Sequence, residues 1–419
     1  MKKIALFTAL IALAFAANAQ SLNVQSAMTD MKRGYISKAK TAIDKACAHE
    51  DTKDQAKTWY YAGLIYSQIG EHSKNPKSKY KDLDPDWRNK TYEAALRCKE
   101  LDKNGEYKQS LKDVFRYVGN DIYNESTDAF NNKHDYNLAL SLADQAIKVF
   151  NNAGDDDYAN SSYYLAGYAC YALNDTVGVK KYFTPLIRRS KVSDDFKSTM
   201  VRVFNIMFGV YKEASDTANV LKTAERYTKM FPNDANAHLL LASAYIWTGN
   251  TNKGLELTNK AVEESKGSVG YPIFLCAAAG NYEQAGDFAT AEAKYKESSE
   301  LNPNQVEANY GMAGMAYNRA VERVKAINEI INSGDFSEEA DAAINKMTQE
   351  SKEFFAQAIP YLKAAINYID GLPDAEKEMK RKNLYDCLTT LNTCYLRLEM
   401  DEESIPIQAR IKEIESKAK

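Results

Sequence analysis

Small, large and aromatic residues recur along this chain at helical spacing and in a similar order. The stretch from Leu275 to Asn304 shows the order most clearly. Apolar positions three and four residues apart predict two amphipathic helices, with a glycine to end the first and a proline to stop the second. The small residues allow the helices to approach closely, and the aromatic residues fill the gaps beside them. The residues that carry this pattern are Ala278, Ala279, Tyr282, Gly286, Ala291, Tyr295 and Pro303.

The same order is clear a second time near the start of the chain, where Trp59, Ala62-Gly63 and Tyr66 are followed by Gly70. In residue types and spacing, these two stretches resemble the tetratricopeptide repeat family, whose unit is a helix–turn–helix of 34 residues. Weaker copies at nearly the same period extend the resemblance over most of residues 20–419. The resemblance implies an all-α, right-handed superhelical solenoid of stacked antiparallel helix pairs. It also implies a non-catalytic scaffold that binds a protein or peptide partner.

Two interruptions break this period. Residues 71–90 are polar, contain Pro76 and Pro85, and are predicted to form a loop inserted within a helix pair. Over residues 318–357 the expected turn is missing, and apolar residues continue at helical spacing on both sides of Asn332–Asp335, which predicts an elongated helical hairpin. Residues 374–419 are predicted to form a C-terminal capping pair. Because both interruptions fall at the turn inside a pair, we expect them on one edge of the array, where they approach each other and narrow one mouth of its groove.

The N-terminus has the pattern of a cleaved secretory signal. Lys2 and Lys3 precede a short apolar run, and small residues surround Ala19. This predicts a signal peptide over residues 1–19, cleaved after Ala19, and an exported, periplasmic protein. No cysteine occurs before Cys47, so the cleavage point has no thiol to carry a lipid. The pair Ala19-Gln20 resembles exported proteins of Bacteroidetes.

The charge and hydropathy of the chain argue against two classes of partner. Cleavage removes two lysines, which takes the net charge from −3 to −5. A mildly acidic chain without a basic stripe argues against nucleic acid. A mean hydropathy of −0.51, with no long apolar run after the signal, argues against membrane insertion.

The cysteines are expected to be buried free thiols. All six remain after cleavage, none has CxxC spacing, and Cys387 and Cys394 lie too far apart along one helix to bond. A bridge between Cys47 and Cys98 is the alternative that remains open.

Residues that would carry catalysis or hold a metal or cofactor are not found in any recognised spacing. The histidines are scattered, and His238 occupies a packing position of the repeat. The acidic run Asp155–Asp157 lacks the alternating ligands of a calcium loop, so a solvated loop that caps the next helix is the favoured interpretation. The sequence therefore predicts a protein that is not an enzyme and has no cofactor.

The resemblance implies that the first helix of each pair lines a concave groove. Some members of the family hold a peptide carboxylate there with lysine and asparagine, but this chain has no Lys or Arg at those positions. The groove is instead aromatic at one end, which suits an extended peptide and, as an alternative, the capture of a ligand such as a glycan. With 28 tyrosines in the chain, the simpler interpretation is that many fill gaps between helices. The candidate groove contacts are Tyr60, Leu64, Tyr164, Tyr168, Tyr171 and Trp247.

Overall fold

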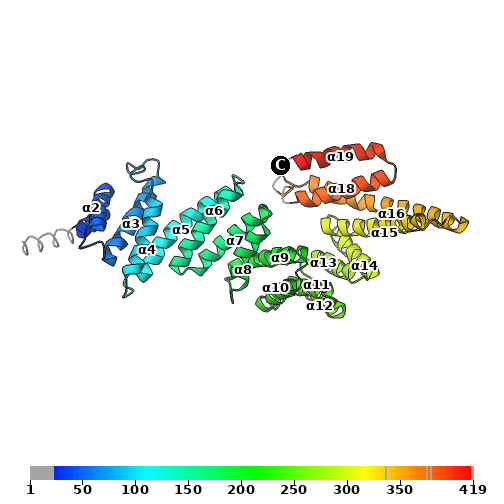
Figure 1. The fold of residues 1–419 in the computed structure, drawn as a ribbon, viewed down its shortest axis with the longest axis horizontal. Coiled ribbons are helices and arrows are strands. Elements are labelled where there is room, and N and C mark those ends of the chain that lie inside the picture. The colour runs from blue at the N-terminus through cyan, green and yellow to red at the C-terminus, as the bar shows by residue number, and fades with distance from the viewer. Residues whose placement is uncertain (1–22, 336, 374–375, 378–379, 417–419) are drawn as a thin grey trace, which may run out of the picture. The chain divides into compact units, whose positions relative to one another are not determined.

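The structure is a computed structural model that describes residues 23–335, 337–373, 376–377 and 380–416 (Figure 1). Within these residues the regular elements are helices, and there is no strand. The chain forms two compact units, of which the first ends at Val210 and the second begins at Tyr211. The predicted signal peptide, residues 1–19, lies outside the described residues.

The first unit opens with a helix over residues 23–32 that packs beside α2 through Val24 and Ala27. The elements that follow are α2 (Ile36–Ala48), α3 (Ala56–Ser73), α4 (Trp87–Leu101), α5 (Lys108–Asn131), α6 (Tyr136–Ala153), α7 (Asp156–Ala172), α8 (Thr176–Ile187), the short 3-10 helix η1 (Asp194–Phe196) and α9 (Lys197–Glu213), which runs across the boundary between the units.

The second unit contains three pairs of helices after α10, and one of these pairs is much longer than the others. A C-terminal pair closes the unit. Its helices are α10 (Thr217–Met230), α11 (Ala235–Trp247), α12 (Thr251–Ser265), α13 (Tyr271–Gln284), α14 (Phe288–Leu301), α15 (Val306–Ser333), α16 (Glu338–Asp370), α18 (Arg381–Arg397) and α19 (Asp401–Ser416).

Consecutive helices pack against each other as antiparallel pairs in both units (Figure 1). Glycines on one helix lie directly beneath an aromatic ring of another, and a Cβ at these positions would collide with the ring. The contacts are Gly70 with Trp87, Gly119 with Phe150, Gly167 with Phe183, and Gly311 with Tyr295. The predicted all-α solenoid of antiparallel helix pairs is therefore confirmed, while the right-handed sense of its superhelix stays a prediction.

The turns inside several pairs share one construction. A residue with positive φ ends the first helix, and the aspartate that follows accepts a backbone hydrogen bond at the start of the second. In the stretch from Leu275 to Asn304, Gly286 has φ +84° and the side chain of Asp287 accepts from the backbone N–H of Thr290. The predicted role of Gly286 as the end of a helix is confirmed.

The inserted connection is shorter than predicted, and the predicted hairpin consists of two long helices. Helix α3 continues to Ser73 and α4 begins at Trp87, so the connection occupies residues 74–86 rather than the predicted 71–90. Helices α15 and α16 form the long hairpin, and α15 ends at Ser333, before Gly334 with φ +71°. Helix α16 runs through Pro360 without ending. The two interruptions belong to different units, so their approach to each other stays a prediction.

The cysteines are free as predicted, whereas Asp155 does not have its predicted role. All six cysteines are free, and five of them are buried; the Cys47–Cys98 bridge is not formed. The sequence predicts that Asp155 caps the next helix from a solvated loop, but its side chain makes no cap hydrogen bond and is only 8% exposed. It accepts a hydrogen bond from Arg116 on α5 instead.

Two further features of the sequence concern His238 and the absence of a long apolar run. His238 is buried, and its Nδ1 lies 2.7 Å from a carboxylate oxygen of Glu264, which confirms a packing histidine. No helix within the described residues has the length and apolar character needed to cross a membrane.

Candidate functional site

Three tyrosines form a continuous stack along one face of α7. The ring centroids of Tyr164 and Tyr168 are 5.6 Å apart at 13° between planes, and those of Tyr168 and Tyr171 are 6.0 Å apart at 20°. Spacings of four and three residues place these side chains on one face of a helix, while Ala166, Ala169 and Cys170 on the opposite side are buried. We call Tyr164, Tyr168 and Tyr171 the tyrosine ladder.

Aromatic residues from neighbouring helices support the ladder. The ring of Phe183 on α8 stacks on Tyr164 with centroids 6.1 Å apart, and Phe130 at the end of α5 lies 5.5 Å from Tyr168. Tyr164 and Tyr168 are half-buried, whereas Tyr171 is 49% exposed. The ladder is thus packed against Phe183 at its Tyr164 end, and its Tyr171 end is open to solvent.

Tyr164 also lines a cavity of about 370 Å³ beside the ladder. Tyr123 of α5 contributes a second ring, and Phe196 of η1 contributes a third. The carboxylates of Asp157 and Asp195 line the cavity. The remaining lining residues carry hydroxyl groups and are Ser161, Ser193 and Thr199. We call this the acidic cavity. It belongs wholly to the first unit.

The acidic cavity has carboxylates available for a ligand. Neither Asp157 nor Asp195 forms an ion pair with a residue that the structure describes. Burial raises the pKa of Tyr164, and a hydrogen bond with Arg202 on α9 opposes this rise. Burial likewise raises the pKa of Tyr123. At neutral pH both phenols are therefore neutral, and the charge of the cavity wall comes from the two carboxylates, with Arg202 beside it.

The structure brings together three of the six predicted contacts. Tyr60 on α3 does not join the ladder but packs against Tyr107, at 4.7 Å between ring centroids, and against Tyr61. Leu64 is half-buried and packs, like Tyr60, against a cluster of buried apolar residues that includes Phe115. Trp247 is the last residue of α11 in the second unit and is half-buried. For all six residues, ligand contact stays a prediction.

Most of the residues that sequence reasoning missed come from outside α7, and Asp157 lies in its first turn. In the sequence, Phe130 is one repeat aromatic among many, and Asp157 belongs to a stretch interpreted as a solvated loop. Tyr123 and Asp195 are separated from α7 by tens of residues, so no local spacing connects them with Tyr164. The local signal that is present, tyrosines four and three residues apart, locates only the ladder itself.

The thiols of the chain are not disposed to act as nucleophiles. Burial raises the pKa of Cys98 to about 12 and that of Cys170 to about 11, so both are protonated at neutral pH. Within the described residues, no three His, Cys, Asp or Glu side chains gather closely enough to hold a metal ion. The chemistry available at the candidate site is binding through rings, hydroxyls and carboxylates.

Comparison with family models and with curated proteins found no match. Solved structures of similar architecture include a tetratricopeptide repeat protein from Parabacteroides merdae, at 13% identity and a TM-score of 0.38 over 64% of this chain and 98% of that one. A repeat protein of the same kind from Bacteroides fragilis has 17% identity and a TM-score of 0.22 over 63% and 97%. Yeast Tom70 has 12% identity and a TM-score of 0.36 over 96% and 95%. Each of these is a likeness of helical architecture alone.

Proposed function

We propose that this protein is a non-catalytic scaffold of the bacterial cell envelope that binds an extended segment of a partner protein. The segment lies along the tyrosine ladder and inserts a Lys or Arg side chain into the acidic cavity. The observation that carries the proposal is the double position of Tyr164, which stacks in the ladder and lines the cavity. The pattern of residues 1–19 supports the envelope.

The walls of the acidic cavity suit a cationic side chain. Aromatic faces attract ammonium and guanidinium groups, and the unpaired carboxylates of Asp157 and Asp195 attract the same charge. The cavity volume of about 370 Å³ falls within the range of sites that enclose small ligands. A single long basic side chain therefore fits both the chemistry and the size of the site.

The geometry of the ladder favours a peptide over a sugar. Sugar rings bind best on open aromatic faces, but the stacked rings of Tyr164 and Tyr168 turn their faces toward each other and toward Phe183. They present edges and hydroxyl groups, which suit peptide groups and side chains. Glycan capture remains the second candidate because Tyr171, at 49% exposure, ends the stack and hydroxyls line the cavity.

A display library of random linear peptides tests the proposal with the mature protein as bait. We expect enriched peptides to share one basic position, with dissociation constants measurable by fluorescence anisotropy. Asp157→Asn with Asp195→Asn removes the charge that selects the basic position, so affinity falls at least tenfold. The control is Glu93→Gln with Glu213→Gln, which removes two exposed charges elsewhere. A library without enrichment, or one whose enriched peptides ignore both aspartates, would contradict the proposal.

The glycan alternative has a test of its own. Saturable quenching of tyrosine and tryptophan fluorescence by an oligosaccharide, lost in Tyr171→Ala, would favour glycan capture over peptide binding. The control variant is Tyr35→Ala, because Tyr35 has the same 49% exposure and lies on another helix pair. Flat titrations over a broad panel of oligosaccharides would exclude the alternative.

A further inference from the structure

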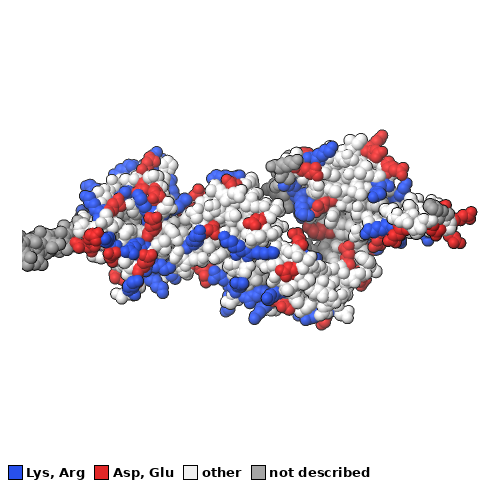
Figure 2. Space-filling view, viewed as in Figure 1, with Lys and Arg blue, Asp and Glu red and all other residues white. Residues whose placement is uncertain are grey.

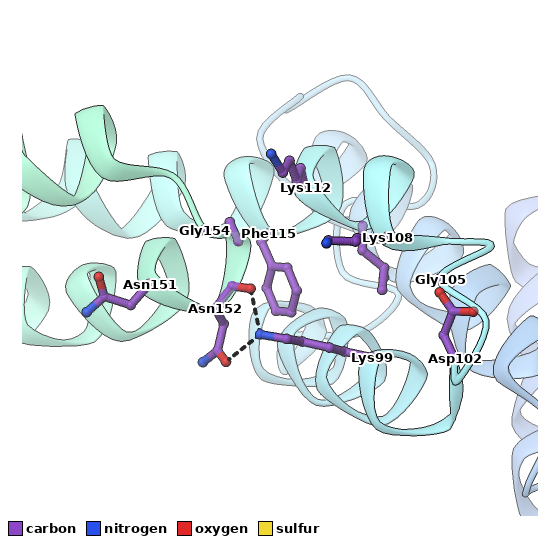
Figure 3. Close-up of a pocket in the computed structure, with 11 residues that line it drawn as sticks. Lys99, Asp102, Gly105, Lys108, Lys112, Phe115, Asn151, Asn152 and Gly154 are labelled. Atoms are coloured by element: carbon purple, nitrogen blue, oxygen red, sulfur yellow. Dashed lines mark hydrogen bonds between the residues drawn. The ribbon is translucent and has the colours of Figure 1, made fainter. Parts of the chain in front are cut away.

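A second cavity of the first unit is lined by lysines. Its volume is about 400 Å³, and it lies among the C-terminal ends of α4 and α6 and the beginning of α5. Lys99, Lys108 and Lys112 line it, and Figure 3 shows Lys99 and Lys108 reaching toward Phe115 from two helices, with Lys112 one turn further along α5. We call this the lysine cavity. It shares no lining residue with the acidic cavity.

The positive charge of this cavity is only partly offset by its own lining. Neither Lys108 nor Lys112 forms an ion pair with any residue that the structure describes. The one carboxylate of the lining, Asp102, accepts hydrogen bonds from the backbone N–H groups of Glu106 and Tyr107, both at 2.8 Å. The lining therefore carries three lysines against one carboxylate, which leaves it with a net positive charge. Figure 2 shows lysine and arginine side chains beside acidic ones over much of the visible surface of this unit.

The third lysine fixes the geometry of the cavity. The ammonium of Lys99 donates to the backbone carbonyl of Asn152 at 2.9 Å and to its side-chain oxygen at 3.3 Å, which ties α4 to α6 (Figure 3). The side-chain amide of Asn152 in turn donates to the hydroxyl of Tyr92 on α4 at 3.0 Å. These bonds use neutral acceptors, so they orient Lys99 without cancelling its charge.

The surroundings strengthen attraction for an anion. The lining residues Leu111, Phe115 and Ala153 are buried and apolar, and low-polarity walls reduce the screening of charges near them. Helix α5 begins at Lys108 with no acidic residue in its first turn, but the Asp102 carboxylate already accepts from the backbone N–H groups just before it. The apolar walls therefore strengthen the attraction by the lysines, and the helix dipole adds little to it.

From these observations we infer that the lysine cavity binds an organic oxyanion, a carboxylate or a phosphate monoester. Lys108 and Lys112 neutralise its charge, and Lys99 closes the side formed by α4 and α6. The inference rests on the cavity and its charges alone, and it does not depend on the peptide proposed for the tyrosine ladder.

Isothermal titration calorimetry of the mature protein at low ionic strength tests the inference with defined probes. The probes are phenylacetate, phenyl phosphate and inorganic phosphate, and phenylacetamide is the uncharged match of phenylacetate. We expect saturable binding of at least one anion at one site and none of the amide. Tighter binding of phenyl phosphate identifies a phosphate ester as the ligand class, and tighter binding of phenylacetate identifies a carboxylate.

Substitution of the lysines locates the site. Lys108→Gln with Lys112→Gln should weaken binding at least tenfold, and neither change touches a buried residue, so circular dichroism should show an unchanged fold. The control pair is Lys325→Gln with Lys412→Gln, which removes two lysines of the second unit, far from the cavity in the chain. The inference is overturned if no anion binds saturably, if phenylacetamide binds as well as phenylacetate, or if the two pairs of variants bind equally.

Discussion

The ring of Phe183 on α8 occupies the space that a Cβ on residue 167 of α7 would need. Gly167 is helical and has no positive φ, so its backbone does not require glycine. The requirement is the close approach of the ring, which is fully buried and also stacks on Tyr164. The position of the tyrosine ladder therefore depends on the absence of one methyl group.

Gly167→Ala should destabilise the protein by about 1–3 kcal/mol, the usual cost of overpacking a filled core. Phe183 cannot move without disturbing the ladder, so the change should also weaken any ligand bound there. Urea unfolding followed by circular dichroism measures the first effect, and binding of the enriched peptide measures the second.

Gly314→Ala is the matched control for this prediction. Gly314 lies inside α15, and a Cβ added there would meet no heavy atom within 4 Å beyond the adjoining backbone of its own helix. Alanine there should leave stability unchanged or raise it by about 0.5–1 kcal/mol, since alanine favours the helix. Equal effects of the two substitutions would refute the role assigned to Gly167.

The helix pairs could be predicted from sequence because the determinants are local. Small residues, aromatic residues and turn-forming glycines recur at fixed spacing, and each pair packs within its own short stretch of chain. Gly286 and the spacing of Tyr164, Tyr168 and Tyr171 both belong to this local class. Such features depend on helical geometry, which the order of residues determines directly.

The remaining features depend on residues that are distant in the sequence. Asp155 occupies a capping position, but its carboxylate accepts a hydrogen bond from Arg116 on another helix instead of from the backbone of α7. The acidic cavity needs Tyr123 and Asp195 beside Tyr164, and the lysine cavity needs the end of α6 beside Lys108. No spacing along the chain encodes these contacts, because they arise only when successive pairs stack.

Asp84 should make stability depend on pH. It is 6% exposed in the connection between α3 and α4, and it pairs with Lys90 at 2.7 Å and with Lys40 at 3.3 Å. Burial acts to raise the pKa of this carboxyl, but hydrogen bonds from Lys90, the Asp86 backbone and Lys40 hold it below its ordinary value. A carboxyl with a lowered pKa in the folded state stabilises the protein above its unfolded pKa of about 3.9, and this stability is lost as pH falls through the folded value.

Asp84→Asn should therefore cost about 1–3 kcal/mol at pH 7, the range for losing a charged hydrogen-bonding partner. The cost should shrink as pH falls below about 4, where the carboxyl of the unfolded chain begins to take up a proton, and should vanish once the folded carboxyl is protonated too. Urea unfolding at pH 7, 5 and 3 measures the difference. Asp82→Asn is the control, because Asp82 is 85% exposed and its charge contributes little. A cost that is independent of pH would contradict the ionic role of Asp84.

The hairpin of α15 and α16 provides a test of partner binding in the second unit. Ala320 and Phe355 belong to the buried core at its base, so replacing all of residues 318–357 would remove core packing as well as the projection. Replacing only residues 326–346 by a short turn removes the far part, where Ile331 is 54% exposed. If the hairpin holds a partner, pull-down from a periplasmic extract should lose a defined protein while thermal unfolding stays cooperative.

A control separates loss of the hairpin from loss of charge. Glu329→Gln with Lys346→Gln keeps the hairpin and changes only exposed side chains, so it should retain the partner. Recovery of the same protein by the shortened chain would show that the hairpin is not its binding surface.

Export should leave a mature chain that begins at Gln20. Lys2 and Lys3, the apolar run and the small residues around Ala19 are what a signal peptidase recognises. Expression of the full chain in a Gram-negative host, followed by osmotic release of the periplasm and mass spectrometry of the intact protein, determines the N-terminus. Ala17→Asp with Ala19→Asp should block cleavage, because both positions require small neutral residues. Recovery of the uncleaved chain from the cytoplasm of wild-type cells would contradict both export and the envelope role proposed for the tyrosine ladder.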